Sequence, residues 1–281
     1  ASTVENLGAA AYLGQAPRIK SPEVLAAALS IHSVEARHAA ALNTLLGKTI
    51  VPDGPFAKPA EAGMVLNAVQ PFIISRDRVE RNKKMTELKT ANIDMVNPEM
   101  ADIQVEGTER SDFLLKGALA AGAIFGLGAI SPFVRGASAK AGGTKGDIEI
   151  LNYALTLEYL ESAFYKEGLK RAGATGALKE LLNTISTDED AHVAALTGTI
   201  KKLGGKPVKA PKVAFDYSDT KGFTTLAESI ENVGVSAYNG AAPMISSKEV
   251  LTAAGSIVQV EARHAAAIAL QNGNEPAPEA F

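Results

Sequence analysis

An internal repeat constrains the fold of this chain more than any other feature. The phrase VEARHAAA occurs at residues 34–41 and again at 260–267. A shift of 226 positions aligns Glu5–Leu42 with Glu231–Ile268 without a gap, and 25 of the 38 aligned residues are identical. The two segments are therefore copies of one structural unit.

Each copy reads as two helices joined by a short Gly/Pro turn. The turn lies at residues 14–17 or 240–243, and Ser21 or Ser246/Ser247 follows it as a candidate N-cap. In the second helix of the first copy, apolar residues recur every three or four positions, and a Glu and a His lie within that stripe. Each copy therefore predicts a helical hairpin with ionisable groups on its apolar face.

A third, more diverged copy spans about residues 147–204. Aligning the copies on a Tyr seven residues after the first Glu gives three matching sets, in which the two glutamates are 30, 31 and 30 residues apart. The sets are Glu5/Tyr12/Glu35/His38, Glu158/Tyr165/Glu189/His192 and Glu231/Tyr238/Glu261/His264. Three of the four histidines of the chain are thus used in the same way.

The composition supports an all-α fold and excludes several functions. Hydrophobic residues make up 46% of the chain, aromatic residues only 5%, and Trp is absent, which favours close-packed helices. The net charge is −3 and no basic stripe appears, so we expect no nucleic-acid binding. The absence of Cys excludes disulfides and thiolate metal sites.

Two different segments separate the first copy from the other two. Residues 48–108 contain several Pro, mixed charge and no sustained periodicity, which indicates a linker. Residues 109–140 contain eighteen uncharged, mostly apolar residues, Gly117–Val134, behind Arg110 and Lys116 and before an ASA triplet. This pattern is typical of an export signal, and a membrane helix or a buried Gly/Ala-rich helix remains an alternative.

Such a signal inside the chain suggests that two sister proteins are joined here, the first represented only by its second half. We expect an exported, extracytoplasmic protein, with possible membrane association through residues 113–134 as a helix. Residues 273–281 form a tail beyond the last hairpin. Because a hairpin does not bury an apolar face alone, we expect residues 1–47 to pair with a second copy of the chain or with a sister subunit.

The repeated Glu and His residues predict a metal site. Glu-x-x-His places both side chains on one face of a helix. Burying ionised carboxylates without partners is costly, so groups that converge on an apolar stripe need mutual hydrogen bonds or cations. Residues 147–272 supply one Glu from each of two helices and Glu-x-x-His from each of two others, the set that holds two metal ions in dinuclear carboxylate proteins. These residues are Glu158, Glu189, His192, Glu231, Glu261 and His264.

Residues 147–272 resemble the ferritin-like family that includes desiccation-related proteins. The matching phrases are LNYALTLEYLESAFY, ENVGVSAYNGAAP and VEARHAAA, and residues 1–47 match only the second half of that domain. The resemblance implies a four-helix bundle over 147–272, a bridged pair of iron or manganese ions, and reactions with dioxygen or peroxide. It also implies that residues 1–47 are half a bundle, in which Glu5, Glu35 and His38 of two chains would build a second dinuclear site.

Other residues near the predicted site have less specific roles. For Tyr165, Tyr238 and Tyr12 we expect core packing with a hydroxyl hydrogen bond. Glu161 shares a helix with Glu158, and we expect it beside the metal ligands or as an alternative ligand. Arg37 and Arg263, two residues after Glu35 and Glu261, point to another face. His32, which has Val in the other copy, is assigned no role.

Two functions follow from this reading. The first is an oxidoreductase, ferroxidase-like or catalase-like, with two iron or manganese ions per complete bundle and a role in stress protection. The second is a non-catalytic stress or assembly protein that keeps the bundle and acts through its surface. Metal content and redox state after aerobic purification distinguish them.

Overall fold

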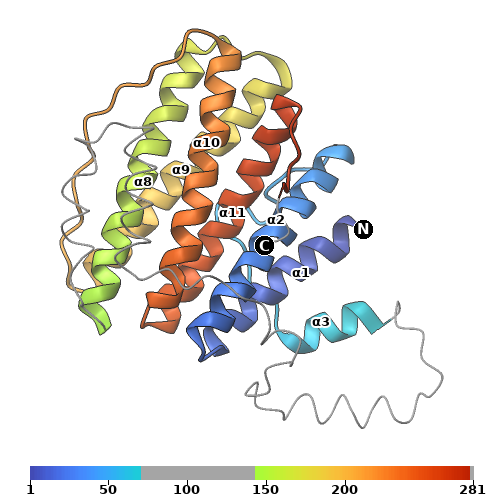
Figure 1. Ribbon diagram of the computed structural model, residues 1–281, viewed down its shortest axis with the longest axis vertical. Helices are drawn as coiled ribbons and strands as arrows, with labels where there is room; N and C mark the ends of the chain where they lie inside the picture. The colour runs from blue at the N-terminus through green and yellow to red at the C-terminus, as the bar shows by residue number, and fades with distance from the viewer. Residues whose placement is uncertain (71–142, 279–281) are drawn as a thin grey trace.

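The computed structural model describes residues 1–70 and 143–278, and in these ranges the chain is helical without strands (Figure 1). The all-α prediction is confirmed. The helices are α1 (Ser2–Gln15), α2 (Pro22–Leu45), α3 (Ala62–Val69), α8 (Gly143–Arg171), α9 (Gly176–Lys202), α10 (Thr220–Ala241) and α11 (Lys248–Asn272), with 3-10 turns η1 (Ala16–Arg18) and η3 (Ala242–Met244). Ser21 and Ser247 cap α2 and α11, each accepting a backbone N–H bond of 3.2 Å.

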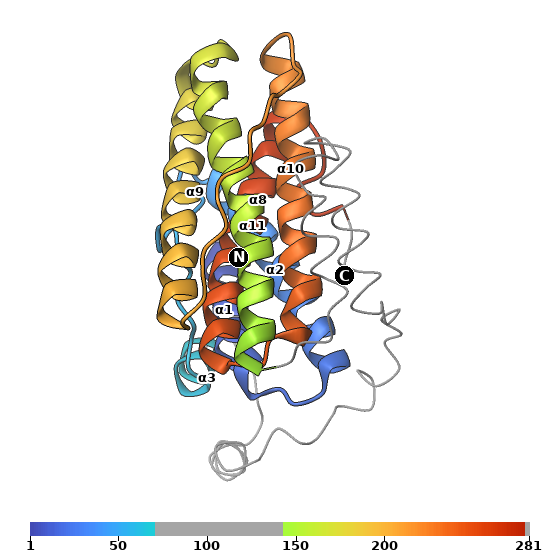
Figure 2. The same ribbon diagram turned by 90° about the vertical axis from the view of Figure 1, so that its left-hand side faces the viewer.

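Helices α8 to α11 form the four-helix bundle predicted for residues 147–272. Hairpin α8–α9 packs beside hairpin α10–α11, and residues 203–219 run the length of the bundle to join them (Figures 1 and 2). One long crossover of this kind is a feature of ferritin-like bundles. Stacked Phe164 and Phe223 rings, 4.4 Å apart, fill the core, and Gly168 makes room because a Cβ there would lie 2.1 Å from the Phe223 ring.

The N-terminal hairpin α1–α2 docks on α11 of the same chain (Figure 1). The contact is reciprocal, since α2 touches η3 while α11 touches η1. A shared apolar cluster contains Ala16 and Leu25 together with their repeat equivalents Ala242 and Leu251. The two copies of the repeat therefore pack against each other about an approximate two-fold axis.

Two buried arginines follow the same symmetry. Arg37 donates to the Pro276 carbonyl at 3.4 Å, and Arg263 donates to the Ile50 carbonyl at 3.1 Å. Positions 50 and 276 are related by the same shift of 226 as the repeat. His32 departs from the symmetry, because the other copy has Val at this position. Its Nε2 lies 2.9 Å from Gln259 Oε1 inside the contact between the two copies of the repeat. The residue that the sequence left without a role thus belongs to the docking surface.

The range expected as a linker is described only as far as residue 70. Ile50, Val51 and Ala57 are buried against the helices, and residues 62–69 form α3. The apolar side chains at these positions explain why this part packs although it has no helical periodicity. Residues 71–108 and the apolar segment 109–140 lie outside the described residues. Within the part that is described, no helix is long and apolar enough to cross a membrane.

Candidate metal centre

The structure brings the six residues predicted as ligands together inside the bundle. Glu158 comes from α8, Glu189 and His192 from α9, Glu231 from α10, and Glu261 and His264 from α11. All six side chains are fully buried, and the two imidazole centroids are 6.4 Å apart. Each residue faces inward because its helix turns its apolar stripe toward the core.

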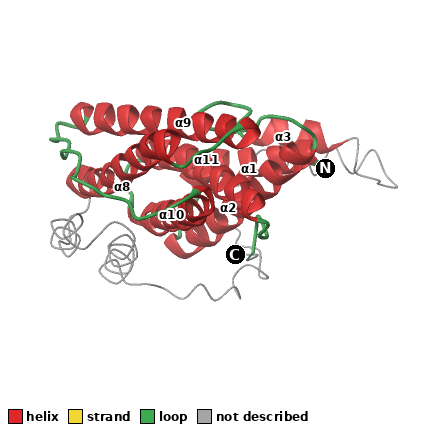
Figure 3. Ribbon diagram, turned by 90° about the horizontal axis from the view of Figure 1, so that it is seen from above, coloured by secondary structure: helices red, strands yellow, loops and turns green. Residues whose placement is uncertain are grey.

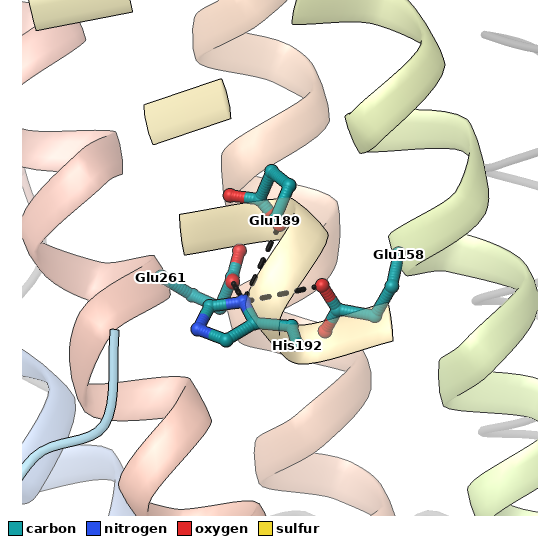
Figure 4. A group of neighbouring side chains, drawn as sticks. All are labelled: Glu158, Glu189, His192 and Glu261. Atoms are coloured by element: carbon teal, nitrogen blue, oxygen red, sulfur yellow. Dashed lines mark hydrogen bonds and ion pairs between the residues drawn. The ribbon is translucent and has the colours of Figure 1, made fainter. Parts of the chain in front are cut away.

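The ligand atoms form two overlapping groups. One contains Glu158, Glu189, His192 and Glu261, which Figure 4 shows, and the other contains Glu189, Glu231, Glu261 and His264. Within each group, one ligand atom per residue lies within 4.8 Å of all the others. Glu189 and Glu261 belong to both groups, so their carboxylates stand between two neighbouring positions for a cation.

His192 turns one ring nitrogen into the site. Its Nδ1 lies 3.0 Å from Glu261 Oε1, 3.2 Å from Glu158 Oε2 and 3.4 Å from Glu189 Oε2 (Figure 4). Its Nε2 lies 2.7 Å from the Pro55 carbonyl oxygen, which only accepts hydrogen bonds. Nε2 therefore donates its hydrogen outward, and Nδ1 is the atom that faces a metal.

His264 has the same arrangement in the second group. Its Nε2 lies 3.1 Å from Asp188 Oδ2, and its Nδ1 lies 3.1 Å from Glu189 Oε1 and 3.6 Å from Glu231 Oε2. Asp188 is itself buried. A carboxylate on the outer nitrogen of a metal-binding imidazole fixes the orientation of the ring and raises its basicity.

Burial and mutual repulsion set the charge state of the carboxyl groups. Burial raises the pKa of Glu158 to about 7, with His192 opposing the shift and Glu189 adding to it. Burial and the neighbouring Glu189 also raise the pKa of Glu261 well above its ordinary range. Burial acts to raise the pKa of Glu189 as well, but the adjacent imidazoles of His192 and His264 outweigh it and lower that pKa.

The carboxylates also raise the pKa of the two imidazoles. Burial alone would lower the pKa of His192, but Glu158 and the other carboxylates raise it well above the ordinary value. His264 behaves in the same way, with Glu231 as the main charge that opposes burial. Protons thus compensate part of the negative charge, as cations do when they bind.

Several buried polar atoms of the site have no hydrogen-bond partner among the residues that the structure describes. They include both carboxylate oxygens of Glu189 and of Glu261, Oε2 of Glu231 and Nδ1 of His264. Leaving such atoms unsatisfied in an apolar interior is costly. The four carboxylates balance the charge of two divalent cations, and oxygen and imidazole ligands suit iron and manganese. The donor set therefore fits a pair of metal ions.

Two tyrosines link the hairpins at this site. The Tyr165 hydroxyl donates to Glu231 Oε1, and the Tyr238 hydroxyl donates to Glu158 Oε1, so each hairpin holds the first glutamate of the other. Burial first, and then the adjacent glutamate, raises the pKa of each phenol well above its ordinary range. The phenols therefore stay protonated and act as donors that orient the carboxylates.

Glu161 is a fifth buried carboxyl group beside the ligands. It is 2% exposed, and its Oε2 has no hydrogen-bond partner in the described part of the chain. Space for it comes from Gly234, where a Cβ would lie 2.9 Å from Glu161 Oε1 and 3.1 Å from Glu261 Oε2. Burial, followed by repulsion from Glu261, raises the pKa of Glu161 well above its ordinary range.

The first copy of the repeat carries a separate cluster. Glu5, Glu35 and His38 place one ligand atom each within 4.8 Å of one another, and His38 Nδ1 lies 3.5 Å from Glu5 Oε2. The two glutamates are half-buried and His38 is exposed. Burial and the adjacent Glu5 raise the pKa of Glu35 to about 7, and Tyr12 lies close enough to Glu35 to have its own pKa raised, mainly by burial.

Asp188 and the Pro55 carbonyl were missed by the sequence reasoning. Alignment of the repeats hid Asp188, because Val34 and Val260 occupy its position in the other copies. A weak signal was available, since Asp188 directly precedes a predicted ligand. Pro55 lies in the range expected as a linker, and nothing in its sequence context points to the site.

Comparisons with known proteins agree with this geometry. The family model of the ferritin-like domain matches residues 1–48 and 146–274, which together make up more than half of the chain. A search of curated proteins finds no match. The matched ranges contain the bundle with its six ligands and the N-terminal hairpin with its cluster of three. The chain therefore belongs to the ferritin-like domain family.

Proposed function

We propose that this protein holds two iron or manganese ions in its bundle and uses them for redox chemistry with dioxygen or peroxide. The observation that carries the proposal is that two four-residue ligand groups share Glu189 and Glu261. Shared carboxylates are what a bridged pair of metal ions needs, and a bridged pair suits two-electron chemistry on a substrate with two linked oxygens.

The residues divide into terminal and bridging ligands. Glu158 and His192 would hold one ion, Glu231 and His264 the other, and the two shared glutamates would bridge them. Redox-active ions held in this way supply electrons to dioxygen, or exchange them with peroxide, in ferroxidase-like or catalase-like reactions. Removal of either oxidant would make the protein protective under stress, in keeping with its resemblance to the ferritin-like family that includes desiccation-related proteins.

The surrounding protein orients these ligands and excludes water. Tyr165 and Tyr238 hold the two terminal glutamates, and Asp188 and the Pro55 carbonyl hold the outer nitrogens of the imidazoles. The six ligands have no exposed surface. A dry, pre-oriented site strengthens electrostatic contacts and limits side reactions of the bound oxidant.

The test is metal content together with turnover. We expect the double variant Glu189→Ala/Glu261→Ala to lose two ions per chain relative to the unmodified protein, measured by mass spectrometry of metals after aerobic purification. Circular dichroism should show that most helicity remains, because Ala is a strong helix former and the apolar clusters of the core keep all their side chains. Glu180→Ala/Glu249→Ala, two exposed glutamates on the same helices, is the matched control and should keep its metal.

Each part of the proposal has its own contradicting result. Unchanged metal content in Glu189→Ala/Glu261→Ala would show that the site is wrongly assigned. Bound iron or manganese that neither consumes dioxygen with Fe(II) nor evolves dioxygen from peroxide in an oxygen electrode would refute the redox function. That second outcome would favour a protein that keeps the metal for structure.

A further inference from the structure

The same eight residues occupy two different environments in this protein. In α11 every residue of the phrase VEARHAAA at 260–267 is buried. In α2, at 34–41, His38 is exposed, and Val34, Glu35 and Ala41 are only half-buried. Helix α11 is covered on both sides, by the bundle and by α2, whereas α2 is covered by α11 and lies at the edge of the molecule (Figure 3).

The side of the N-terminal hairpin that carries ligands is left half-buried or exposed by the part of the chain that the structure describes. We call it the open face, and its half-buried or exposed residues are Glu5, Gly8, Tyr12, Ile31, Glu35, His38 and Leu42. Glu5, Glu35 and His38 correspond by the repeat to Glu231, Glu261 and His264, which in α10–α11 are ligands of the bundle site.

The local geometry of the bundle site is retained on the open face. Glu5, Glu35 and His38 already bring one ligand atom each within 4.8 Å of one another, two carboxylates with one imidazole. A Cβ at Gly8 would lie 3.4 Å from Glu35 Oε2, as one at Gly234 would lie 3.1 Å from Glu261 Oε2. The hairpin thus carries half of a dinuclear ligand set on a side that the described residues leave open, in the arrangement that its copy uses when covered.

A hairpin that carries a Glu, a Tyr and a Glu-x-x-His is complementary to a second hairpin with the same residues. In the bundle, each hairpin contributes a Glu, a Tyr and a Glu-x-x-His, and the tyrosines Tyr165 and Tyr238 reach across to the first glutamate of the opposite hairpin. Two open faces together supply four carboxylates and two imidazoles, which balance two divalent cations. One open face supplies only two carboxylates and one imidazole, and it lacks the carboxylate that would close a bridge.

We propose that two copies of this chain pair through their open faces, and that Glu5, Glu35 and His38 of both copies build a second dinuclear metal centre on the two-fold axis. Tyr12 of each copy then donates to Glu5 of the other. The inference rests on the proposed function, because it assigns to this face the metal chemistry of the bundle. A second copy is the occupant because the matching half-set is its own and a two-fold contact is self-complementary.

The docking of the hairpin on its own bundle leaves this pairing free. Arg37 follows Glu35 by two residues, about 200° around the helix, and it reaches Asn232 of α10 at 2.6 Å. The side of α2 that holds the bundle therefore lies opposite the side that carries Glu35. Each copy keeps its internal contacts when the open faces meet.

The experiment combines metal content with molecular mass for the full chain. Purified protein is stripped with a chelator, Mn(II) or anaerobic Fe(II) is added back, and mass is measured by light scattering after size exclusion. We expect three ions per chain in a dimer that dissociates on chelation. Glu35→Gln/His38→Gln should keep two ions per chain and weaken dimerisation at least about tenfold, because ligands on both sides of the axis are lost.

Two further variants keep the inference falsifiable. Leu42→Asp places a charge on the open face without touching a ligand, and we expect it to be monomeric with two ions per chain. Glu261→Gln/His264→Gln is the matched change in the second copy, and we expect it to lose the bundle ions while the metal-dependent dimer remains. Circular dichroism of each variant checks that the helices are intact.

Three results would overturn the inference. They are a monomer with two ions per chain, a third ion bound by a monomer, and a dimer unaffected by Glu35→Gln/His38→Gln. Failure of the proposed metal site in the bundle gives a different result, since then Glu261→Gln/His264→Gln would lose no metal. If that variant loses two ions while the unmodified protein never dimerises, only the pairing of open faces is refuted.

Discussion

Acidification should detach the N-terminal hairpin from α11 through a single histidine. His32 is fully buried in the docking surface, and its Nε2 lies 2.9 Å from Gln259 Oε1. Burial lowers the pKa of His32 to about 4, with Gln259 opposing the shift and Arg263 adding to it. Nδ1 has no hydrogen-bond partner among the described residues, so a second proton placed there would find no hydrogen-bond acceptor.

The size of the stability loss follows from the difference between the pKa of His32 in the folded and in the unfolded chain. The ordinary pKa is 6.5 and the folded value about 4, so the unfolded chain binds the proton more tightly and stability falls as pH falls. At about 1.4 kcal/mol per pKa unit the full loss is about 3 kcal/mol. It begins near pH 6.5, reaches about 2 kcal/mol at about pH 5, and is complete below about pH 4.

The assay is urea unfolding of the chelator-treated protein at about pH 7.5 and about pH 5, followed by circular dichroism. His32→Gln, which has no titrating group, serves as the reference. The site histidines His192 and His264 have raised pKa values, so their contribution is lost as pH rises instead, but it is the same in both proteins and cancels. We expect the unmodified protein to lose about 2 kcal/mol more than His32→Gln over this range.

Hydrogen exchange locates the effect. In the unmodified protein at the lower pH, amides of α2 should exchange faster while those of α8 keep their protection, because the hairpin opens before the bundle. An equal pH-dependent loss in the two proteins would refute the reasoning. It would mean that His32 is not held neutral in a dry contact, and hence that the hairpin does not dock on α11.

Three further predictions concern the metal centre. Gly234→Ala would place a methyl group 2.9 Å from Glu161 Oε1, so we expect weaker metal binding in a chelator competition. The matched Gly8→Ala, with its nearest oxygen at 3.4 Å, should leave the metal affinity of the bundle site unchanged. Equal effects of the two variants on this affinity would contradict the prediction. Asp188→Asn removes the charge on the outer nitrogen of His264 and should weaken metal binding about 10- to 100-fold in the same competition, so an unchanged affinity would exclude its role. Carboxylates raise the pKa of both site imidazoles despite burial, so metal binding should release protons, which a pH indicator in weak buffer detects. The metal affinity should therefore decrease as the pH is lowered. An affinity that does not change between about pH 6 and about pH 8 would refute this prediction.

Local spacing in the sequence was enough to predict the elements and the ligands of the bundle. A Glu-x-x-His pair lies on one face of a helix wherever the helix forms, and the apolar residues around Glu189 and Glu261 require that face to be buried. The Gly/Pro turns and the serine caps predicted where each hairpin bends. These properties depend on neighbours within a few positions along the chain, which is why they can be read without a structure.

Only the tertiary structure decided what covers each face. VEARHAAA is the same string at 34–41 and 260–267, yet one copy is enclosed and the other is partly open, because burial is a property of the neighbouring helices and not of the string. The same reason explains why Asp188 and the Pro55 carbonyl were missed. The imidazoles that they contact lie 76 and 137 residues away along the chain. This reason also explains His32, which has a role only because the docking of the two repeats places Gln259 opposite it.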